Sequence, residues 1–121
     1  MRVVLQRVER AVAYQGDVSV AQIGVGLVLF TGFAGTDTPV TVDRMARKIA
    51  NLRVFEHGES KVGRSLLEVA GAALTLSQFT VYGDTSRGRR PGFSRGAPAE
   101  LAASLYVRFA EQLTAAGIAE V

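Results

Sequence analysis

The chain has 121 residues, of which 48% are hydrophobic and 21% charged, as expected for one folded domain spanning residues 1–121. It contains no cysteine and a single histidine, so disulfides, thiolate catalysis and multi-histidine metal centres are excluded, and we expect no cofactor. The charged N-terminal segment and the absence of any apolar run of about 18 residues predict a cytoplasmic protein without a membrane partner.

The first third of the chain has the period-two pattern of β-strands. Val3 and Leu5 share one strand face, and residues 15–17 (Gln-Gly-Asp) are a turn signal between two further strands. The continuous apolar run 27–30 suits a buried central strand. These strands, taken in order, predict a β-meander.

Two helices are predicted downstream. Thr38 is a helix cap followed by Pro39, and apolar residues then repeat on one face, which predicts a helix over 39–51. A second helix begins at Pro98, repeats apolar residues at intervals of four, and meets a C-terminal cap at Gly117.

The intervening segments add short strands. We expect strands at 53–55 and 72–82, a loop or single turn at 61–71, a Gly- and Arg-rich loop at 83–96, and the start of another strand at 118–121. Together the elements predict an α+β fold: a mostly antiparallel sheet that curls toward a barrel, with two helices on one side.

The net charge of +3 is concentrated in one segment. Removing the four arginines of residues 84–95 leaves a net charge of −1; they are Arg87, Arg89, Arg90 and Arg95. A local arginine cluster is typical of a surface that binds nucleic-acid phosphates. It is also compatible with a solvated loop whose arginines pair with nearby carboxylates.

An unusual group of polar residues occurs in a segment that otherwise resembles a buried strand. Ser77, Gln78 and Thr80 place three hydrogen-bonding side chains within four residues. Where such a strand meets a loop, these groups can line a pocket. Alternatively, Thr80 is only a good strand former and Ser77 faces water at a sheet edge.

The segment SQFTVYGDTSRGRRPGF (77–93) resembles the signature of the D-aminoacyl-tRNA deacylases, also called D-tyrosyl-tRNA deacylases. MRVVLQRVERA (1–11), GVGLVLF (24–30), KIANLRVF (48–55) and the FSRGAP…LY stretch (93–106) fall in that family's order and spacing. The likeness covers essentially the whole chain.

The resemblance implies a homodimeric enzyme that hydrolyses the ester between a D-amino acid, or glycine, and the terminal adenosine of tRNA. Ser77, Gln78, Phe79 and Thr80 would form the floor of the pocket, where the backbone N–H groups of Phe79 and Thr80, with the Thr80 hydroxyl, would meet the aminoacyl group. Arg7 would brace the site from the neighbouring strand. The arginines of segment 84–95 are our own assignment for RNA binding, made on charge.

Two mechanisms stay open. Either Thr80 is a transient nucleophile, or the substrate's ribose hydroxyl assists an attacking water while Thr80 only positions it. We favour the second, because an unactivated hydroxyl is a poor nucleophile at neutral pH, and His57 is expected in an exposed turn.

The sequence departs from the family at its C-terminal end. Members carry a Gly-Pro dipeptide there, held in the cis form, which reaches across the dimer and blocks L-amino acids. This chain ends at Val121, and its prolines follow Thr38, Arg90 and Ala97. We therefore expect relaxed stereoselectivity and partly exposed strand edges.

Two other classes of function fit the same residues. One is a catalytically impaired tRNA- or RNA-binding module of this fold. The other is a β-rich protein that associates with itself through an exposed edge, with the arginines only improving solubility. Salt-dependent tRNA binding separates the self-associating protein from the enzyme and the binding module. Turnover of aminoacyl-tRNA then separates the enzyme from the binding module.

Overall fold

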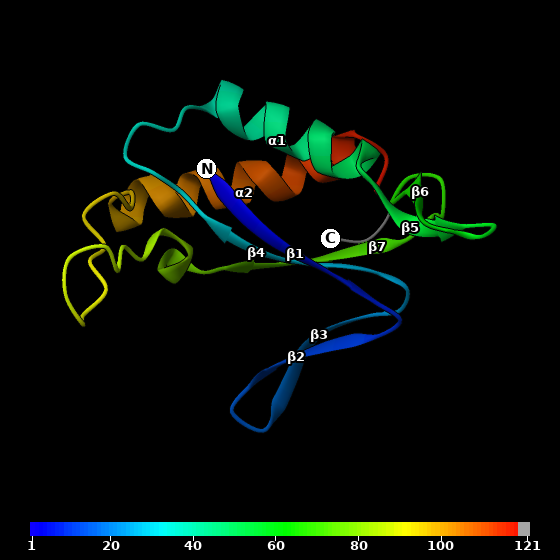
Figure 1. Cartoon of the computed structure of the whole chain (residues 1–121), viewed down its shortest axis with the longest axis horizontal. Helices are drawn as coiled ribbons and strands as arrows, with labels where there is room; N and C mark the ends of the chain where they lie inside the picture. Colours follow the sequence, from blue (N-terminus) through cyan, green and yellow to red (C-terminus); the bar gives the residue numbers. More distant parts are fainter. Residues whose placement is uncertain (119–121) are drawn as a thin grey trace.

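A computed structural model describes residues 1–118 of the chain (Figure 1). Strands precede the first of two long helices and separate it from the second. The elements are β1 (Arg2–Val8), β2 (Ala11–Gln15), β3 (Val18–Ile23), β4 (Gly26–Gly32), α1 (Pro39–Asn51), β5 (Arg53–His57), β6 (Ser60–Ser65), β7 (Ala72–Ser77), the 3-10 helix η1 (Phe79–Tyr82) and α2 (Ala99–Ala115).

The central sheet has three strands in the order β1-β4-β7. β1 runs antiparallel to β4, and β4 runs parallel to β7. The parallel pair needs a long crossover, which α1 and the β5-β6 hairpin supply. At Gly26 a Cβ atom would lie 1.9 Å from the carbonyl oxygen of Ala72, so the close approach of β7 to β4 requires glycine there.

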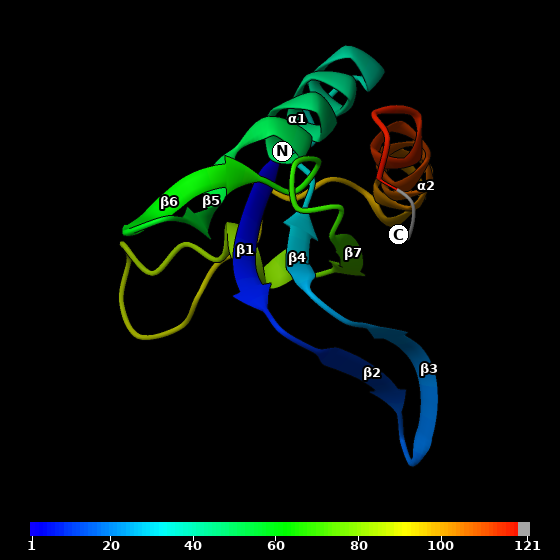
Figure 2. The same ribbon diagram turned by 90° about the vertical axis from the view of Figure 1, so that its right-hand side faces the viewer.

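The predicted β-meander is wrong. Strands β2 and β3 pair only with each other, around a turn at Gly16, which has a φ of 62°. The hairpin extends away from the central sheet (Figure 2). Strand β1 therefore pairs with β4, and not with β2, which follows it in the sequence. Period-two alternation identified the strands, but it carries no information about which strands pair.

Both helices cover the same face of the central sheet (Figures 1 and 2), as an α+β fold with two helices on one side requires. Fully buried side chains from the sheet and from both helices form the main core between them, including Leu27, Leu29, Val42, Phe109 and Leu113. The other face carries a smaller apolar cluster beneath the β2-β3 hairpin, formed by Ile23, Val28, Ala72 and Leu74.

The helix ends follow their local signals. The Thr38 side chain accepts a hydrogen bond from the Thr41 amide at 3.4 Å, and α1 spans the predicted residues. α2 ends before Gly117, whose φ of 110° favours glycine. Neither helix in the described part of the chain has the length and apolar character needed to cross a membrane.

An ion pair joins the two helices. Arg108 donates from Nε and Nη2 to the two carboxylate oxygens of Asp43, each at 2.7 Å. Hydrogen bonding by Arg108 lowers the pKa of Asp43. The pair fixes the crossing of α1 and α2 on their solvent side.

Three segments differ from prediction or lie outside the description. Residues 60–65 form β6 instead of loop, followed by a turn in which Ser65 and Glu68 each accept the other's amide hydrogen. The strand predicted over 72–82 ends at Ser77, and η1 follows. Of the strand predicted at 118–121, only Ile118 is described, and residues 119–121 are outside the described residues.

Candidate functional site

The chain leaves the central sheet at the SQFT segment (77–80). Ser77 is the last residue of β7, and the Gln78 amide donates to the carbonyl oxygen of Thr31 at 2.7 Å. A Cβ at Gly32 would lie 2.2 Å from Val81 Cγ2, so a glycine in β4 lets η1 pack against the sheet. Tertiary contacts to β4 therefore convert a strand-forming sequence into a turn of 3-10 helix.

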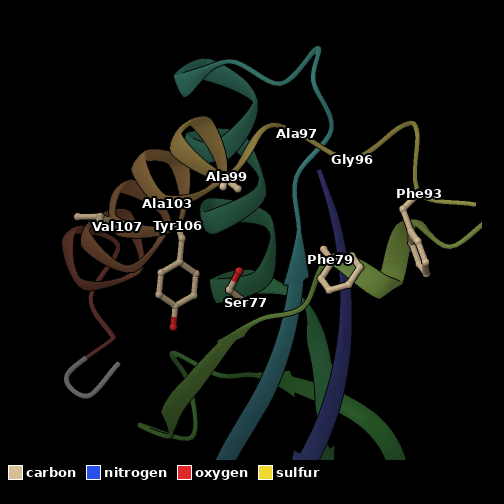
Figure 3. A pocket seen from close by; sticks show the side chains of 10 residues that line it. Ser77, Phe79, Phe93, Gly96, Ala97, Ala99, Ala103, Tyr106 and Val107 are labelled. Carbon is tan, nitrogen blue, oxygen red and sulfur yellow. The ribbon is translucent and has the colours of Figure 1, made fainter.

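A cavity of about 580 Å³ lies beside this turn, between η1 and α2 (Figure 3). We call it the SQFT cavity. Small side chains on the facing side of α2 leave the space open. Its lining comprises Ser77, Phe79, Phe93, Gly96, Ala97, Ala99, Ala102, Ala103, Tyr106 and Val107.

Aromatic side chains form part of the cavity wall. Phe79 and Phe93 meet edge to face, with ring centroids 5.1 Å apart and an interplanar angle of 71°. Phe79 is 64% exposed and Phe93 is 38% exposed, so both rings are accessible to a ligand. Rings of this kind, open to solvent beside a cavity, suit stacking of a nucleic-acid base.

Tyr106 connects α2 to β7 across the cavity. Its ring extends from α2 toward Ser77 (Figure 3). Its hydroxyl donates to the Thr75 carbonyl oxygen at 2.7 Å and lies 3.0 Å from Thr75 Oγ1. Because Thr75 is buried, this contact fixes the distance between the helix and the strand that carries Ser77.

The structure brings only part of the predicted floor to the cavity wall. Ser77 and Phe79 line it, whereas the Gln78 and Thr80 side chains hydrogen-bond to each other. The amides of Phe79 and Thr80 begin η1, where a helix leaves its first N–H groups without internal acceptors. No acceptor for either amide is found among the described residues, so both can donate to a ligand.

Arg7 does not lie beside the SQFT segment. Strand β4 separates β1 from β7, and Arg7 lies at the far end of β1, opposite Leu27. Its Nη1 donates to the carbonyl oxygens of Val54 and Lys61, each at 2.9 Å. It lines a different cavity of about 490 Å³, the Arg7 cavity, together with Val8, Glu9, Val25, Phe55, Glu56, Arg64 and Val69.

Arg2 occupies the position that had been expected for Arg7. Its Nη1 donates to the Val81 carbonyl oxygen at 2.8 Å, and its guanidinium lies 4.5 Å from the centre of the Tyr82 ring. No pattern in the sequence singled out Arg2. The register Arg2↔Gly32 in β1-β4 places it at the SQFT end, and no local pattern reveals that register.

In the arginine segment (84–95), residues 84–92 form a loop that is closed by a bridge between Asp84 and Gly92. Residues 93–95 follow this loop. The amide of Asp84 donates to the Gly92 carbonyl oxygen and the amide of Gly92 donates back, each at 2.8 Å. The Asp84 carboxylate accepts from the Ser86 amide at 2.9 Å, and hydrogen bonding by Ser86 lowers the pKa of Asp84. The loop projects at the end of the molecule where α2 begins (Figure 1). Arg87, Arg89, Arg90 and Arg95 are exposed, and none forms an ion pair within residues 1–118.

The other titratable side chains do not converge on the SQFT cavity. His57 ends β5 and is exposed, and it is not among the lining residues. Within residues 1–118 no three His, Asp or Glu side chains are grouped as a metal site would require. The SQFT cavity therefore offers backbone donors, one serine hydroxyl, one tyrosine hydroxyl and apolar walls.

Comparison with known proteins identifies the family to which this chain is similar. The profile of the family described as D-Tyr-tRNA(Tyr) deacylase matches residues 4–121. The D-aminoacyl-tRNA deacylase of Desulforudis audaxviator is 48% identical over 118 residues, covering 98% of this chain and 79% of that protein. The D-aminoacyl-tRNA deacylase of Symbiobacterium thermophilum is 50% identical over 118 residues, covering 98% of this chain and 78% of that protein.

Solved structures show the same fold. The c-Myc DNA Unwinding Element Binding Protein superposes with a TM-score of 0.88 and 36% identity, covering 95% of this chain and 77% of that chain. A probable eukaryotic D-amino acid tRNA deacylase superposes with a TM-score of 0.80 over 94% of this chain and 67% of that chain. At 21% identity the second likeness concerns the fold alone.

Proposed function

Since this chain belongs to the D-Tyr-tRNA(Tyr) deacylase family, we propose that it hydrolyses the ester of mischarged D-aminoacyl-tRNA, and of glycyl-tRNA, to free amino acid and tRNA. The observation that carries this proposal is the cavity lined by Ser77 and Phe79 at the start of η1. An RNA-binding module without activity is not favoured, because the curated relatives carry the name of an enzyme.

The dimensions of the SQFT cavity suit the end of an aminoacyl-tRNA. Small-molecule sites commonly enclose about 300–1,000 Å³ and combine apolar walls with a few polar groups. The volume of about 580 Å³ falls in that range. In our proposal the terminal adenosine packs against the alanines of α2 and the exposed Phe79 ring, with the ester next to Ser77 and η1.

The chemistry follows from the groups around that cavity. Water attacks the ester carbonyl carbon, and negative charge develops on the carbonyl oxygen. The amides of Phe79 and Thr80 stabilise that charge by donating hydrogen bonds. The bond between the carbonyl carbon and the ribose oxygen then breaks, and the proton from water passes to the leaving ribose oxygen.

The ten lining residues include no carboxylate, imidazole or amine that could act as a general base. The neighbouring ribose hydroxyl of the substrate is therefore our proposed partner for the attacking water. Thr80 already accepts a hydrogen bond from Gln78 and positions η1 through that contact. Gln78 and Thr80 thus support the site, while Ser77 and Phe79 contact the substrate.

Deacylation of D-aminoacyl-tRNA by the purified chain tests the function. We expect release of the amino acid well above the uncatalysed rate, and its absence would contradict the proposal. Thr80→Val separates the mechanisms, because we expect it to remain close to wild type. A fall of about 10⁴-fold or more, as for loss of a catalytic nucleophile, would instead assign the attack to Thr80.

We propose that Arg87, Arg89, Arg90 and Arg95 bind tRNA phosphates. Their exposure, and a loop that projects near the start of α2, support this role. Replacing Arg87, Arg89 and Arg90 by glutamine should reduce the slope of log affinity against log salt by about 2–3 units, since each phosphate contact contributes about 0.7–0.9. The matched control replaces three exposed basic residues of α1, Arg44, Arg47 and Lys48, and an equal loss of slope there would contradict the assignment.

A homodimer in the cytoplasm, where charged tRNA is used, completes the proposal. β1 and β7 are the outer strands of the central sheet, and each has one edge that no other described strand covers. Analytical ultracentrifugation should give twice the monomer mass. A monomer at micromolar concentration that retains full activity would contradict the dimer.

A further inference from the structure

A second cleft adjoins the SQFT cavity. It has a volume of about 390 Å³, and Gly96 belongs to the walls of both. It forms where the loop after β4 meets the segment before α2: Ala34 and Gly96 form an antiparallel bridge, and the Gly35 amide donates to the Arg95 carbonyl oxygen at 3.4 Å. We call it the Arg95 cleft, lined by Ala34, Gly35, Thr36, Ser94, Arg95 and Gly96.

The polar groups of this cleft are donors. Thr36 and Ser94 contribute hydroxyls and Arg95 contributes a guanidinium, all three exposed. None of these side chains forms a hydrogen bond or an ion pair with another part of residues 1–118. A guanidinium beside two hydroxyls matches the oxygens of a phosphate.

The nearby carboxylates already have partners. Asp37, next to Thr36, accepts from the Met1 ammonium at 2.5 Å and from the Ala34 amide at 2.7 Å. Asp84 accepts from the Ser86 amide. Neither forms an ion pair with Arg95, so its guanidinium is available to an anion from outside the chain.

We propose that the Arg95 cleft binds the 5′-phosphate of the terminal adenosine, which is the phosphodiester that joins the last two nucleotides of tRNA. This inference rests on the proposed function. A nucleoside in the SQFT cavity has its 5′-phosphate one ribose away from its ester, and the cleft that shares Gly96 with that cavity is the adjoining space.

The proposal separates Arg95 from the other three arginines. Arg87, Arg89 and Arg90 lie inside the loop closed by the Asp84–Gly92 bridge, whereas Arg95 lies beyond it, in the cleft wall. Arg95 therefore acts on the last nucleotide alone. The loop arginines act only when the body of the tRNA is present.

Two small substrates test this. One is adenosine with a D-amino acid esterified to its ribose, and the other is the same molecule carrying a 5′-phosphate. For the wild type we expect the phosphate to lower KM by about tenfold, the equivalent of one charge-assisted hydrogen bond. Arg95→Gln should remove that difference between the two substrates, and Arg95→Lys should restore part of it.

Arg44→Gln is the matched control, because Arg44 is an exposed arginine of α1 away from both cavities. It should keep the full effect of the phosphate. Equal KM values for the two substrates in the wild type, or an unchanged phosphate effect in Arg95→Gln, would overturn this inference and leave the proposed function intact. Failure to hydrolyse both small substrates and D-aminoacyl-tRNA would overturn the proposed function and this inference with it.

Discussion

The two ends of the central sheet each carry a cavity of similar size, but the two differ in chemistry. The SQFT cavity has backbone amides, small residues and aromatic rings around it, whereas the Arg7 cavity is bordered by Arg7, Glu9, Glu56 and Arg64. Arg2 and Arg7, five positions apart on β1, each brace one end through backbone carbonyl oxygens. The end with small residues and aromatic rings leaves space for a substrate, while the more highly charged end supports the β5-β6 hairpin.

Filling the SQFT cavity should have the largest effect. Ala103→Trp places an indole in the space proposed for the terminal adenosine, so we expect kcat/KM to fall by about 100-fold or more. Ser104→Trp is the control, because Ser104 is exposed on the same helix and does not line the cavity. Steady-state deacylation measures both, and equal activities of the two variants would contradict the location of the site.

The two arginines of β1 should separate catalysis from stability. Arg2→Ala removes the support of Val81 and Tyr82, so we expect η1 to loosen and kcat/KM to fall by about tenfold, the equivalent of one charged hydrogen bond. Arg7→Ala should instead lower the free energy of unfolding by about 1–2 kcal/mol, because it holds β5 and β6. Deacylation rates and urea unfolding of both variants decide this, and the reverse pattern would place the site at the Arg7 cavity.

A smaller effect is expected at the contact between α2 and β7. Tyr106→Phe keeps the ring in the wall but loses the hydrogen bond to Thr75, which is worth about 0.5–1.5 kcal/mol. We expect KM to rise a few-fold with kcat nearly unchanged, because the cavity changes width while its donors stay in place. A fall in kcat at constant KM would show that the hydroxyl itself takes part in the reaction.

The smallest effect concerns pH. Hydrogen bonding by Ser65 lowers the pKa of Glu68, and hydrogen bonding by Ser86 lowers the pKa of Asp84. A lowered folded-state pKa stabilises the fold above the ordinary values of 4.5 and 3.8, and this contribution is lost as pH falls through the lower folded-state values.

The midpoint of urea unfolding should therefore be insensitive to these groups between pH 7 and 5 and should decrease below about pH 4. Glu68→Gln removes the titrating group in the turn that leads into β7, and Asp84→Asn removes the one in the arginine segment. In each variant the urea midpoint should therefore decrease less steeply with falling pH than in the wild type. An acid decrease identical to wild type in both would show that these hydrogen bonds do not contribute to stability.

Local signals predicted the helices and the unusual character of the SQFT segment. The start of α1 at Thr38-Pro39 and the end of α2 at Gly117 depend on the backbone preferences of single residues, so the sequence predicts them directly. Ser77 was identified because polar residues in a strand-like segment need an explanation, whereas Phe79 followed only from the resemblance to the family; both line the cavity. Local chemistry was therefore sufficient for the helices and for Ser77.

The pairing of strands and the braces between them could not be predicted in that way. The end of β7 at Ser77 depends on a hydrogen bond to Thr31 and on the lack of a side chain at Gly32, both in a strand more than forty residues earlier. The register of β1 with β4 determines that Arg2, and not Arg7, lies at the SQFT end of the sheet. The Ser65–Glu68 turn did have a sequence signal, the S-x-x-E spacing of a capping box.

Titration with a stable substrate analogue tests the central claim most directly. An adenosine whose ribose carries a D-amino acid through an amide instead of an ester should bind without being hydrolysed. NMR of the labelled chain should then show the largest changes at the amides of Phe79, Thr80 and Ala103, and little change at Arg7 and Phe55. Changes concentrated around Arg7 and Phe55, or no changes at millimolar analogue, would contradict the account.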